Sequence, residues 1–294
     1  MTEESLSKLP QKMQDTYKYY CVTEEIQNLN MDSIILTPEI ELEVNKFRNE
    51  FEHREQFYEY GLTNINRVLS YGASGTGKTF LAKCLASHYG LELFTVDLAN
   101  IIASDNAYNE LASVFELARQ VKNSIIFLDE CDQIARERGS LNNSPKLRQL
   151  INGLFKLMDS LDKTNICMAA TNMEEQLDRA FVRRFDLKLK FYRPDVNFID
   201  NTIEKFISPK FKYIKNADSN IRYALMEAAK NYTGLSFAEI EIWVQRAEKD
   251  AILRGSTEFT QSEVYEFLMR SMGFKMCENE NNGRYLYQSA AKNI

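Results

Sequence analysis

The sequence predicts an α/β fold in which a parallel β-sheet lies between two layers of helices and a small all-helical domain follows. Three observations support this fold class. Short apolar runs alternate with helical patterns between residues 67 and 191, as in a parallel sheet covered by helices on both faces. A glycine-rich turn joins the first of these runs directly to a helix. Beyond Pro194 the sequence carries helix starts and no strand signals.

The composition is that of a globular chain, and it argues against several classes of function. The 294 residues are 44% hydrophobic, and the net charge of −6 with a pI near 5.3 argues against a general attraction to nucleic acid or to an anionic membrane. Five separated cysteines and two histidines argue against a zinc site or a Ser/His/Asp triad, and suit a reducing cytoplasm. No apolar run approaches the about 18 residues of a membrane span, so we expect a soluble, cytoplasmic protein.

Two helical segments precede the first expected strand of the sheet. Residues 1–30 are polar and tyrosine-rich and predict a short helical extension. Mixed charged and apolar residues at helical spacing predict a helix from Pro38 to about Glu59. Arg67 to Tyr71 is a short β-type run, and Lys78 to Tyr89 then repeats apolar residues at helical spacing until Gly90. The order is therefore strand, glycine-rich turn and helix.

The same alternation continues through the rest of the large domain. We expect Pro145 to be a first helical residue, because proline is favoured there. The apolar run of residues 124–128 indicates a strand buried on both faces. The other expected elements are strands at 91–96, 165–170 and 187–191, a helix at 109–121, and a loop at 139–144.

The last third of the sequence predicts a small helical domain. Ser236 with Glu239 and Thr260 with Glu263 form two S/T-x-x-E capping boxes ahead of apolar-periodic runs. The tail from Met276 is polar, so we expect it to be loosely ordered. The expected organisation is an extension at 1–30, an ATP-binding domain at 31–193, a helical lid at 194–275 and a tail at 276–294, the nucleotide following from the motifs below.

A phosphate-binding motif occupies the glycine-rich turn. Residues 72–79 read G-A-S-G-T-G-K-T and fit G-x-x-x-x-G-K-[ST] between a predicted strand and a predicted helix. Backbone N–H groups of Gly72, Ser74, Gly75, Thr76 and Gly77 would surround the phosphates, with help from the helix dipole. Lys78 would reach the β- and γ-phosphates and Thr79 would ligate Mg²⁺. The alternative is a chance glycine-rich turn.

Two adjacent carboxylates follow a buried strand about fifty residues later. Ile125 to Leu128 deliver Asp129 and Glu130 to the carboxyl end of that strand. Asp129 would hold Mg²⁺ through its water shell, and Glu130 would polarise the attacking water. Taken alone, the pattern also describes a strand that enters a solvated loop. After the phosphate-binding motif, it indicates ATP hydrolysis with Mg²⁺.

Around these motifs the sequence resembles an AAA-type ATPase of the AAA+ superfamily, from about Asp32 to about Phe274. Residues 129–132 (D-E-C-D) are similar to the family's D-E-x-D, and residues 169–172 (A-A-T-N) to its A-A-T-N. The resemblance implies a P-loop NTPase core in which Asn172 orients the lytic water with Glu130. Residues 234–240 resemble the start of the family's lid helix, which implies that Ala238 lines the nucleotide pocket. By the same resemblance Phe80, which directly follows the phosphate-binding motif (the P-loop, residues 72–79), also lines this pocket. From the residues alone, Asn172 also fits a turn former at a strand end.

An arginine pair matches another segment of the family. Residues 177–186 (L-D-R-A-F-V-R-R-F-D) resemble its L-D-x-A…R-F-D segment, which implies that Arg184 is an arginine finger placed against the γ-phosphate of a neighbouring subunit. Arg183 could substitute for it, since the family's second arginine falls at Leu187. A finger is worth about 10³–10⁵ in rate because it neutralises charge on the transferring phosphoryl group. A solvated basic turn is the alternative for both arginines.

One segment departs from the family. Residues 97–108 lack the aromatic-hydrophobic-glycine triplet with which members grip a polypeptide in a central pore, and Tyr108 is the nearest aromatic residue. The resemblance therefore implies a self-associating ring, of six subunits by family likeness, that remodels or disassembles a protein partner without processive threading. Two alternatives stay open: a nucleotide-dependent switch or scaffold that recruits an effector, and a nucleic-acid loader or translocase, which the acidic pI disfavours.

Overall fold

The computed structural model describes residues 6–22, 28–135, 145–195, 198–216, 219, 221–223, 225–226, 235–278 and 285–289. The loop expected at 139–144 and Gly234 of the lid segment lie outside the described residues. The chain divides into two compact units, Met1–Tyr192 and Arg193–Ile294, and each is described by itself.

A six-stranded sheet forms the centre of the first unit, in the order β1-β3-β4-β5-β2-β6. The five strands from β2 to β6 are parallel, which confirms the predicted α/β class, and only β1 runs antiparallel to its neighbour β3. The strands are β1 (Cys21–Val22), β2 (Arg67–Gly72), β3 (Glu92–Val96), β4 (Ser124–Leu128), β5 (Ile166–Thr171) and β6 (Leu187–Phe191).

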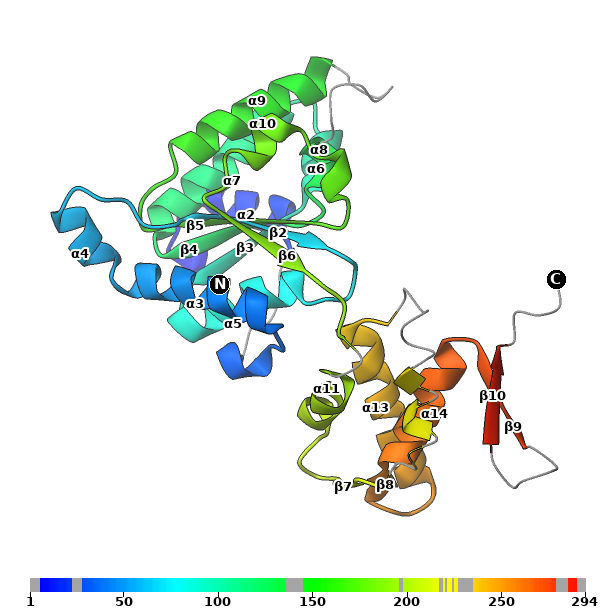
Figure 1. The fold of residues 1–294 in the computed structure, drawn as a ribbon. Helices are drawn as coiled ribbons and strands as arrows, with labels where there is room; N and C mark the ends of the chain where they lie inside the picture. The colour runs from blue at the N-terminus through cyan, green and yellow to red at the C-terminus, as the bar shows by residue number, and fades with distance from the viewer. Residues whose placement is uncertain are drawn as a thin grey trace. The chain divides into compact units, whose positions relative to one another are not determined.

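Helices cover both faces of this sheet, as Figure 1 shows. The strand period of two divides the apolar side chains between the faces: Ile126 and Leu128 of β4 join one core cluster, and Ile125 and Phe127 join the other. Helices α3 (Pro38–Glu52) and α5 (Lys78–Tyr89) pack on the second face. The first face carries α2 (Gln11–Tyr20), α6 (Leu98–Ala103), α7 (Ala107–Val121), α8 (Asp132–Ala135), α9 (Pro145–Asp159) and α10 (Arg179–Val182).

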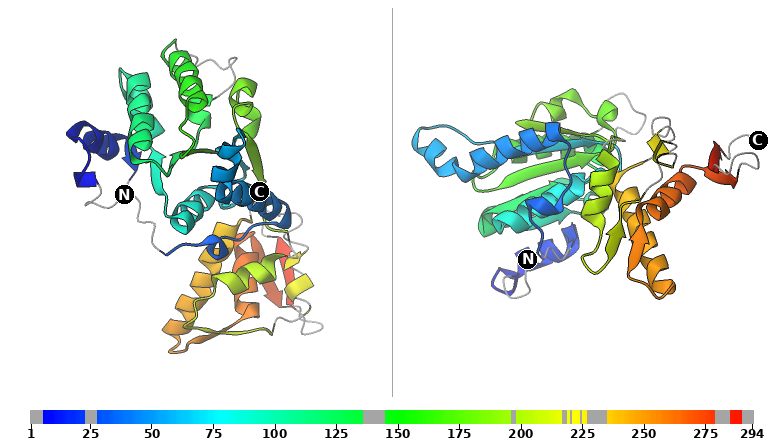
Figure 2. Two further views of the ribbon diagram at one scale, coloured as in Figure 1. Left: turned by 90° about the vertical axis from the view of Figure 1, so that its left-hand side faces the viewer. Right: turned by 60° about the horizontal axis from the view of Figure 1, so that its bottom comes forward.

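The N-terminal extension belongs to the sheet as well as to the helical layer. Helix α2 lies against α7 (Figure 2). The Thr16 hydroxyl donates to that of Ser113 at 3.4 Å. The ring of Tyr17 is buried and packs edge-on against Phe94, with ring centroids 6.1 Å apart. The helix was expected, but β1 was not, because a two-residue strand shows no alternation in sequence. Pairing of Cys21 with Val96 places it on the edge of β3.

The remaining connections of this unit are short. The helix expected from Pro38 to Glu59 is broken at His53, where the backbone (φ −101°, ψ 12°) leaves the helical region and α4 (Arg54–Glu59) begins. Two 3₁₀ turns, η1 (Met31–Ser33) and η2 (Glu174–Gln176), complete the connections among the described residues.

The second unit is built around helices α11 (Ile199–Phe206), α13 (Phe237–Leu253) and α14 (Gln261–Ser271). Both predicted capping boxes form at the starts of α13 and α14. The expectation of no strands beyond Pro194 was wrong: β7 (Lys212–Ile214) pairs in parallel with β8 (Glu258–Thr260), and β9 (Phe274–Glu278) pairs with β10 (Tyr285–Ser289), partly inside the segment expected to be a loose tail. Three-residue strands are too short to show a period. No helix among the described residues is long and apolar enough to cross a membrane.

Candidate ATPase site

The phosphate-binding loop connects β2 to α5 and depends on its glycines. Gly72 has a φ of +131°, and a Cβ there would meet the carbonyl oxygen of Phe191 at 2.1 Å. Gly75 and Gly77 have φ angles of +72° and +103°, which side chains rarely adopt. Gly77 is the N-cap of α5, so the loop ends at the positive end of a twelve-residue helix. This backbone suits an anion that approaches closely.

Side chains tie the loop together from within. The Lys78 ammonium group is nearly buried and donates to the carbonyl oxygens of Gly72 at 2.8 Å and Ala73 at 2.6 Å. The Thr76 hydroxyl, also buried, donates to the same Ala73 carbonyl at 2.8 Å. The lysine charge therefore lies inside the curve of the loop. Ser74, by contrast, is exposed at its tip, and so is Phe80 beyond it on α5.

Two oxygen ligands suited to Mg²⁺ meet beside the loop. The Thr79 hydroxyl on α5 donates to Oδ2 of Asp129, at the end of β4, at 2.8 Å. The described residues contain no group of three His, Cys, Asp or Glu side chains that could hold a metal by itself. A pair of protein oxygens that leaves the remaining positions to phosphates and water is how Mg²⁺ is usually held in nucleotide sites. The residues thus fit a cation that arrives with the nucleotide.

Glu130 is held by its backbone and by a neighbouring side chain. Its φ of +48° is unusual for a residue with a side chain, and its N–H donates to Oδ1 of Asp129 at 2.9 Å. The amide of Gln133 donates to Oε2 of Glu130 at 2.9 Å. Gln133 is not among the residues predicted from the sequence, although a spacing of three residues at the start of a helix is a signal for such a contact.

The third strand end brings Asn172 to the same edge of the sheet. Strand β5 lies between β4 and β2, with Leu128 opposite Ala169 and Tyr71 opposite Thr171. Asn172 directly follows β5 and is exposed. The buried carboxylate of Asp132 accepts the Thr171 hydroxyl at 2.9 Å, so the end of β5 is bonded to the segment that carries Glu130.

Among the residues around Glu130, the thiol of Cys131 is unsuited to chemistry. It is completely buried, and its N–H donates to the Ala170 carbonyl at 2.9 Å. Burial raises the pKa of Cys131 well above its ordinary value, and the neighbouring carboxylates of Asp132 and Asp129 add to the effect. A protonated thiol is a poor nucleophile, so the carboxylates are the reactive groups here.

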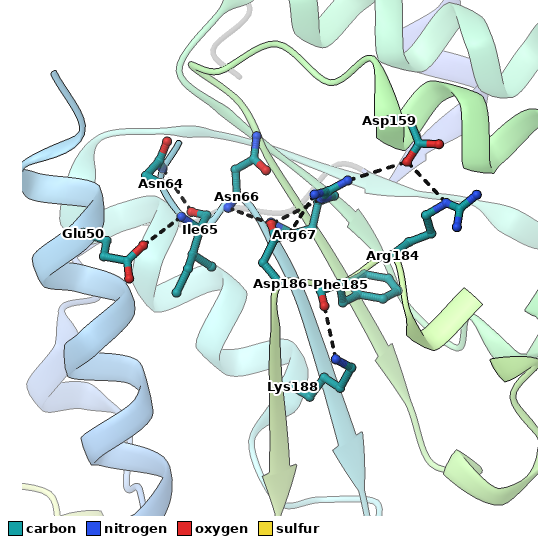
Figure 3. A network of polar contacts seen from close by, with 10 residues as sticks. All are labelled: Glu50, Asn64, Ile65, Asn66, Arg67, Asp159, Arg184, Phe185, Asp186 and Lys188. Carbon is teal, nitrogen blue, oxygen red and sulfur yellow. Dashed lines mark hydrogen bonds and ion pairs between the residues drawn. The ribbon is translucent and has the colours of Figure 1, made fainter. Parts of the chain in front are cut away.

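The arginine pair lies at the other edge of the sheet. Figure 3 shows Arg184 beside Asp159, at the end of α9, and near Arg67, at the start of β2. Arg184 Nε lies 3.3 Å from Asp159 Oδ1, and Arg67 Nη1 lies 3.6 Å from the same oxygen. Arg183 is exposed at the end of α10. At about 3.3 Å per residue, β2 separates Arg67 from Gly72 by about 16 Å.

The first unit therefore brings Lys78, Thr79, Asp129, Glu130 and Asn172 together at the carboxyl ends of β2, β4 and β5, and keeps the arginines away from them. Ala238 is the second residue of α13 in the other unit.

Known proteins resemble this chain over much of its length. A profile of the "ATPase family associated with various cellular activities (AAA)" matches residues 68–193. The chain is 35% identical over 208 residues to an uncharacterized AAA family ATPase, y4kL, of Sinorhizobium fredii, which covers 69% of this chain and 59% of that protein.

Two further relatives have more specific names. Peroxisomal ATPase PEX6 of Saccharomyces cerevisiae is 30% identical over 251 residues, covering 81% of this chain and 24% of that protein. ATP-dependent zinc metalloprotease FtsH 1 of Conexibacter woesei is 32% identical over 237 residues, covering 78% of this chain and 35% of that protein. The chain thus spans less than two thirds of the length of each of these three relatives.

Proposed function

Because the chain belongs to the AAA family of ATPases, we propose that it assembles into a ring, of six subunits as is usual in the family, and uses ATP hydrolysis to remodel or disassemble a protein partner. The proposal extends the family's ATPase activity in three ways: it assigns roles to individual residues, it requires neighbouring subunits to complete each site, and it limits the action on the partner to local rearrangement.

The position of Arg184 is the observation that carries the ring. A finger must lie within hydrogen-bond distance of the phosphoryl oxygens, whereas Arg184 lies with Arg67 at the amino end of β2, about 16 Å from the P-loop. A long side chain does not cross that distance. An arginine at this edge can serve a neighbouring subunit whose P-loop edge faces it, so the position supports a site shared between subunits.

Within one subunit, the proposed roles follow from chemistry and position. Lys78 neutralises the β- and γ-phosphates that the loop N–H groups bind. Thr79 and Asp129 hold Mg²⁺, which on binding with ATP supplies positive charge to the phosphates as negative charge develops there. Glu130 accepts a proton from the attacking water, and Asn172 orients that water from the adjacent strand end.

Single substitutions test these roles. Lys78→Ala should abolish ATP binding, because it removes the charge that faces the phosphates. Glu130→Gln should bind ATP normally, while turnover falls by at least about a hundredfold, as expected for loss of a general base. Fluorescent-nucleotide titration and phosphate release measure the two properties. Normal turnover by Glu130→Gln would remove Glu130 from the mechanism.

The shared site is tested by mixing two inactive variants. Arg184→Ala subunits keep Glu130, and Glu130→Gln subunits keep the finger, so some interfaces of a mixed ring contain both intact groups. Turnover should reappear on mixing and should scale with the number of such interfaces. Mixed oligomers that form, as judged by co-purification of two different tags, and yet stay inactive would contradict a finger acting between subunits.

Local action is supported by the segment that differs from the family. Leu98 and Ile101 of α6 are buried in the core, while Ala99, Asn100 and Ala103 are exposed, and these are small or polar. A grip on a chain of arbitrary sequence needs large apolar side chains. Tyr108, the nearest aromatic residue, packs its ring against Gly153 of α9, where an added Cβ would lie 2.2 Å from Tyr108 Cδ2.

The partner can be captured with Glu130→Gln, which should stall with ATP and partner bound, using Lys78→Ala as the matched control. A stable fluorescent domain is then fused to the captured partner and followed during ATP turnover. Partner release or rearrangement with the reporter still folded supports local remodelling. Reporter unfolding that is lost in Tyr108→Ala would contradict it, and ATP-dependent association without any rearrangement would favour a switch or scaffold instead.

A further inference from the structure

The strongest polar contact at the amino edge of the sheet joins Arg67 to Asp186. Arg67 Nε donates to Asp186 Oδ2 at 3.2 Å, and Nη2 donates to Oδ1 at 2.8 Å, so both carboxylate oxygens are bound in the fork geometry of a strong guanidinium–carboxylate pair. Two backbone N–H groups add hydrogen bonds between the same residues. Asp186 N–H donates to the Arg67 carbonyl at 2.9 Å, and Arg67 N–H donates to the Asp186 side chain, at Oδ2, at 3.1 Å. The side-chain hydrogen bonding that Arg67 donates to Asp186 raises the pKa of Arg67.

A second contact links Arg67 to Arg184 itself. Oδ1 of Asp159 lies 3.6 Å from Arg67 Nη1 and 3.3 Å from Arg184 Nε, so one carboxylate oxygen is shared by two guanidinium groups (Figure 3). The Arg184 guanidinium also lies over the ring of Phe155, 4.9 Å from its centroid. Arg67 therefore reaches Arg184 by two routes: through Asp159, and through the backbone of Phe185, the one residue between Arg184 and Asp186.

The two contacts differ in strength in a useful way. The side chains of Arg67 and Asp186 are 27% and 28% exposed, whereas those of Arg184 and Asp159 are 36% and 51% exposed. The Arg184–Asp159 ion pair is partly exposed, and Arg184 Nε, although buried, makes no hydrogen bond among the described residues, so the pair contributes at most about 1 kcal/mol and Arg184 can leave Asp159 at small cost. The bidentate pair between Arg67 and Asp186, together with its backbone hydrogen bonds, fixes the backbone next to Arg184. A side chain with a fixed backbone and a guanidinium group that is only weakly held can reach a target from a defined position.

We propose that Arg67 is a positioning residue for Arg184: it fixes Asp186 and Asp159 so that Arg184 is presented to the nucleotide of a neighbouring subunit. This inference rests on the proposed role of Arg184 between subunits. It assigns no contact with the nucleotide to Arg67, and it adds a residue that neither the sequence motifs nor the P-loop geometry single out.

The competing explanation is that Arg67 supports its own subunit's site. Arg67 begins β2, and β2 ends in the P-loop, so its loss could disturb phosphate binding in the same chain. The two explanations predict opposite results in mixed oligomers. If Arg67 acts through Arg184, an Arg67→Ala subunit keeps a competent ATP site and lacks only a well-placed finger. If it acts on its own P-loop, that subunit has no competent site.

The experiment measures turnover and nucleotide affinity of full-length Arg67→Ala, alone and mixed with Glu130→Gln. Alone, its turnover should fall about tenfold to a hundredfold, the cost expected from a misplacement of about 1 Å, with ATP affinity within about twofold of the unsubstituted protein. Mixed with Glu130→Gln, it should regain activity as Arg184→Ala does. Arg119→Ala, which removes an exposed arginine paired with Glu116 on α7, is the matched control and should change neither quantity.

The Arg184→Ala mixture separates the two levels of the proposal. Recovery with Arg184→Ala but not with Arg67→Ala overturns the positioning role and leaves the shared site intact. Recovery with neither overturns the shared site itself. Unchanged turnover in Arg67→Ala also overturns the positioning role, as does a large loss of ATP affinity.

Two further variants make the result independent of folding defects. Arg67→Lys keeps the charge and loses the fork, so its turnover should lie between those of Arg67→Ala and the unsubstituted protein. The double variant Arg67→Ala/Arg184→Ala should turn over no more slowly than Arg184→Ala alone, because one function is removed twice. Multiplied losses in the double variant would mean that Arg67 acts independently of Arg184, and would refute the proposal.

Discussion

The contact between Gly153 and Tyr108 predicts that Gly153→Ala has opposite effects on the free energy of unfolding in the unsubstituted protein and in Tyr108→Ala. Gly153 lies in the middle of α9, and a Cβ there would meet Cδ2 and Cε2 of Tyr108 at 2.2 and 2.5 Å. Carbon atoms pack at about 3.5–4.0 Å, so in Gly153→Ala the ring would have to move by more than about 1 Å. All three of the nearest atoms belong to Tyr108, and the clash depends on this one side chain.

The expected magnitude follows from two opposing terms. Forcing an extra methyl group into a packed site costs about 1–3 kcal/mol. Replacing glycine by alanine inside a helix contributes about 0.8–1 kcal/mol of stability. Gly153→Ala should therefore lower the free energy of unfolding by about 1 kcal/mol. In the Tyr108→Ala background only the helical term remains, so the same substitution should raise it by about 1 kcal/mol.

Urea unfolding of the four proteins in this cycle measures both effects. Far-UV circular dichroism follows the helices of both units, so the effect on the first unit, in which both residues lie, is the change in the dichroism transition that the fluorescence of the second unit does not share. The chain has a single tryptophan, Trp243 in α13 of the second unit, so its fluorescence follows that unit and acts as an internal control. The midpoint seen by fluorescence should not move. An equal loss of stability in both backgrounds would show that the methyl group does not meet Tyr108, and the structural argument against a gripping role for Tyr108 would fail with it.

Two further predictions concern the ligands and the thiols. Chelation of Mg²⁺ with EDTA should stop phosphate release, and added Mg²⁺ should restore it. Thr79→Ala should need more Mg²⁺ for half-maximal turnover, and an unchanged Mg²⁺ requirement would contradict the role of Thr79 as a ligand. Burial raises the pKa of Cys84 to about 11 and that of Cys167 to about 12, so at pH 8 about one thiol in a thousand or fewer is ionised in the folded chain. Mass spectrometry should find both protected from a thiol reagent until urea is added. Since these folded-state values are raised, the stability gained from neutral thiols is present below their ordinary pKa and lost as the pH rises toward 11–12.

Much of the first unit could be predicted from sequence because its strands carry clear local patterns. The apolar run at 124–128, buried on both faces, became β4 with the expected bounds, and the run at 187–191, in which buried apolar residues alternate with exposed lysines, became β6. Both patterns are local, so a sequence displays them directly. By contrast, β1 and β7 owe their existence to partners distant in the chain, Val96 for Cys21 and Glu258 for Lys212, and their own residues carry no alternation.

The candidate site divides in the same way. The P-loop and the carboxylates after β4 could be predicted because their chemistry demands fixed residue types at fixed spacing. Their roles stay predictions until the variants are measured. Arg67 and Asp159 could not be found in this manner, since a bidentate pair or a shared carboxylate depends on side chains that meet only after β2, α9 and β6 have packed. Polar contacts of this kind carry no local signature.

The N-terminal extension offers a last prediction, which concerns how firmly the edge of the sheet is held. Tyr17 of α2 is 4% exposed and packs against Phe94, while Tyr19 on the same helix is 66% exposed. Two hydrogen bonds connect the extension to the start of α6. Asp97 N–H donates to the Tyr20 carbonyl at 2.9 Å, and the side-chain amide of Asn100 donates to the Tyr19 carbonyl at 2.6 Å.

Removing a buried aromatic side chain costs about 3–5 kcal/mol, and exposed positions change stability by less than about 0.5 kcal/mol. Tyr17→Ala should therefore destabilise the first unit by several kcal/mol, and Tyr19→Ala should not, because the carbonyl that binds Asn100 is retained. Hydrogen exchange locates the effect: amides of β1 and α6 should lose protection in Tyr17→Ala under conditions where β2 and β4 stay protected. Equal destabilisation by the two substitutions would contradict the packing of Tyr17 on Phe94 as the contact that holds the extension to the edge of β3, because alanine favours a helix more than tyrosine does at both positions.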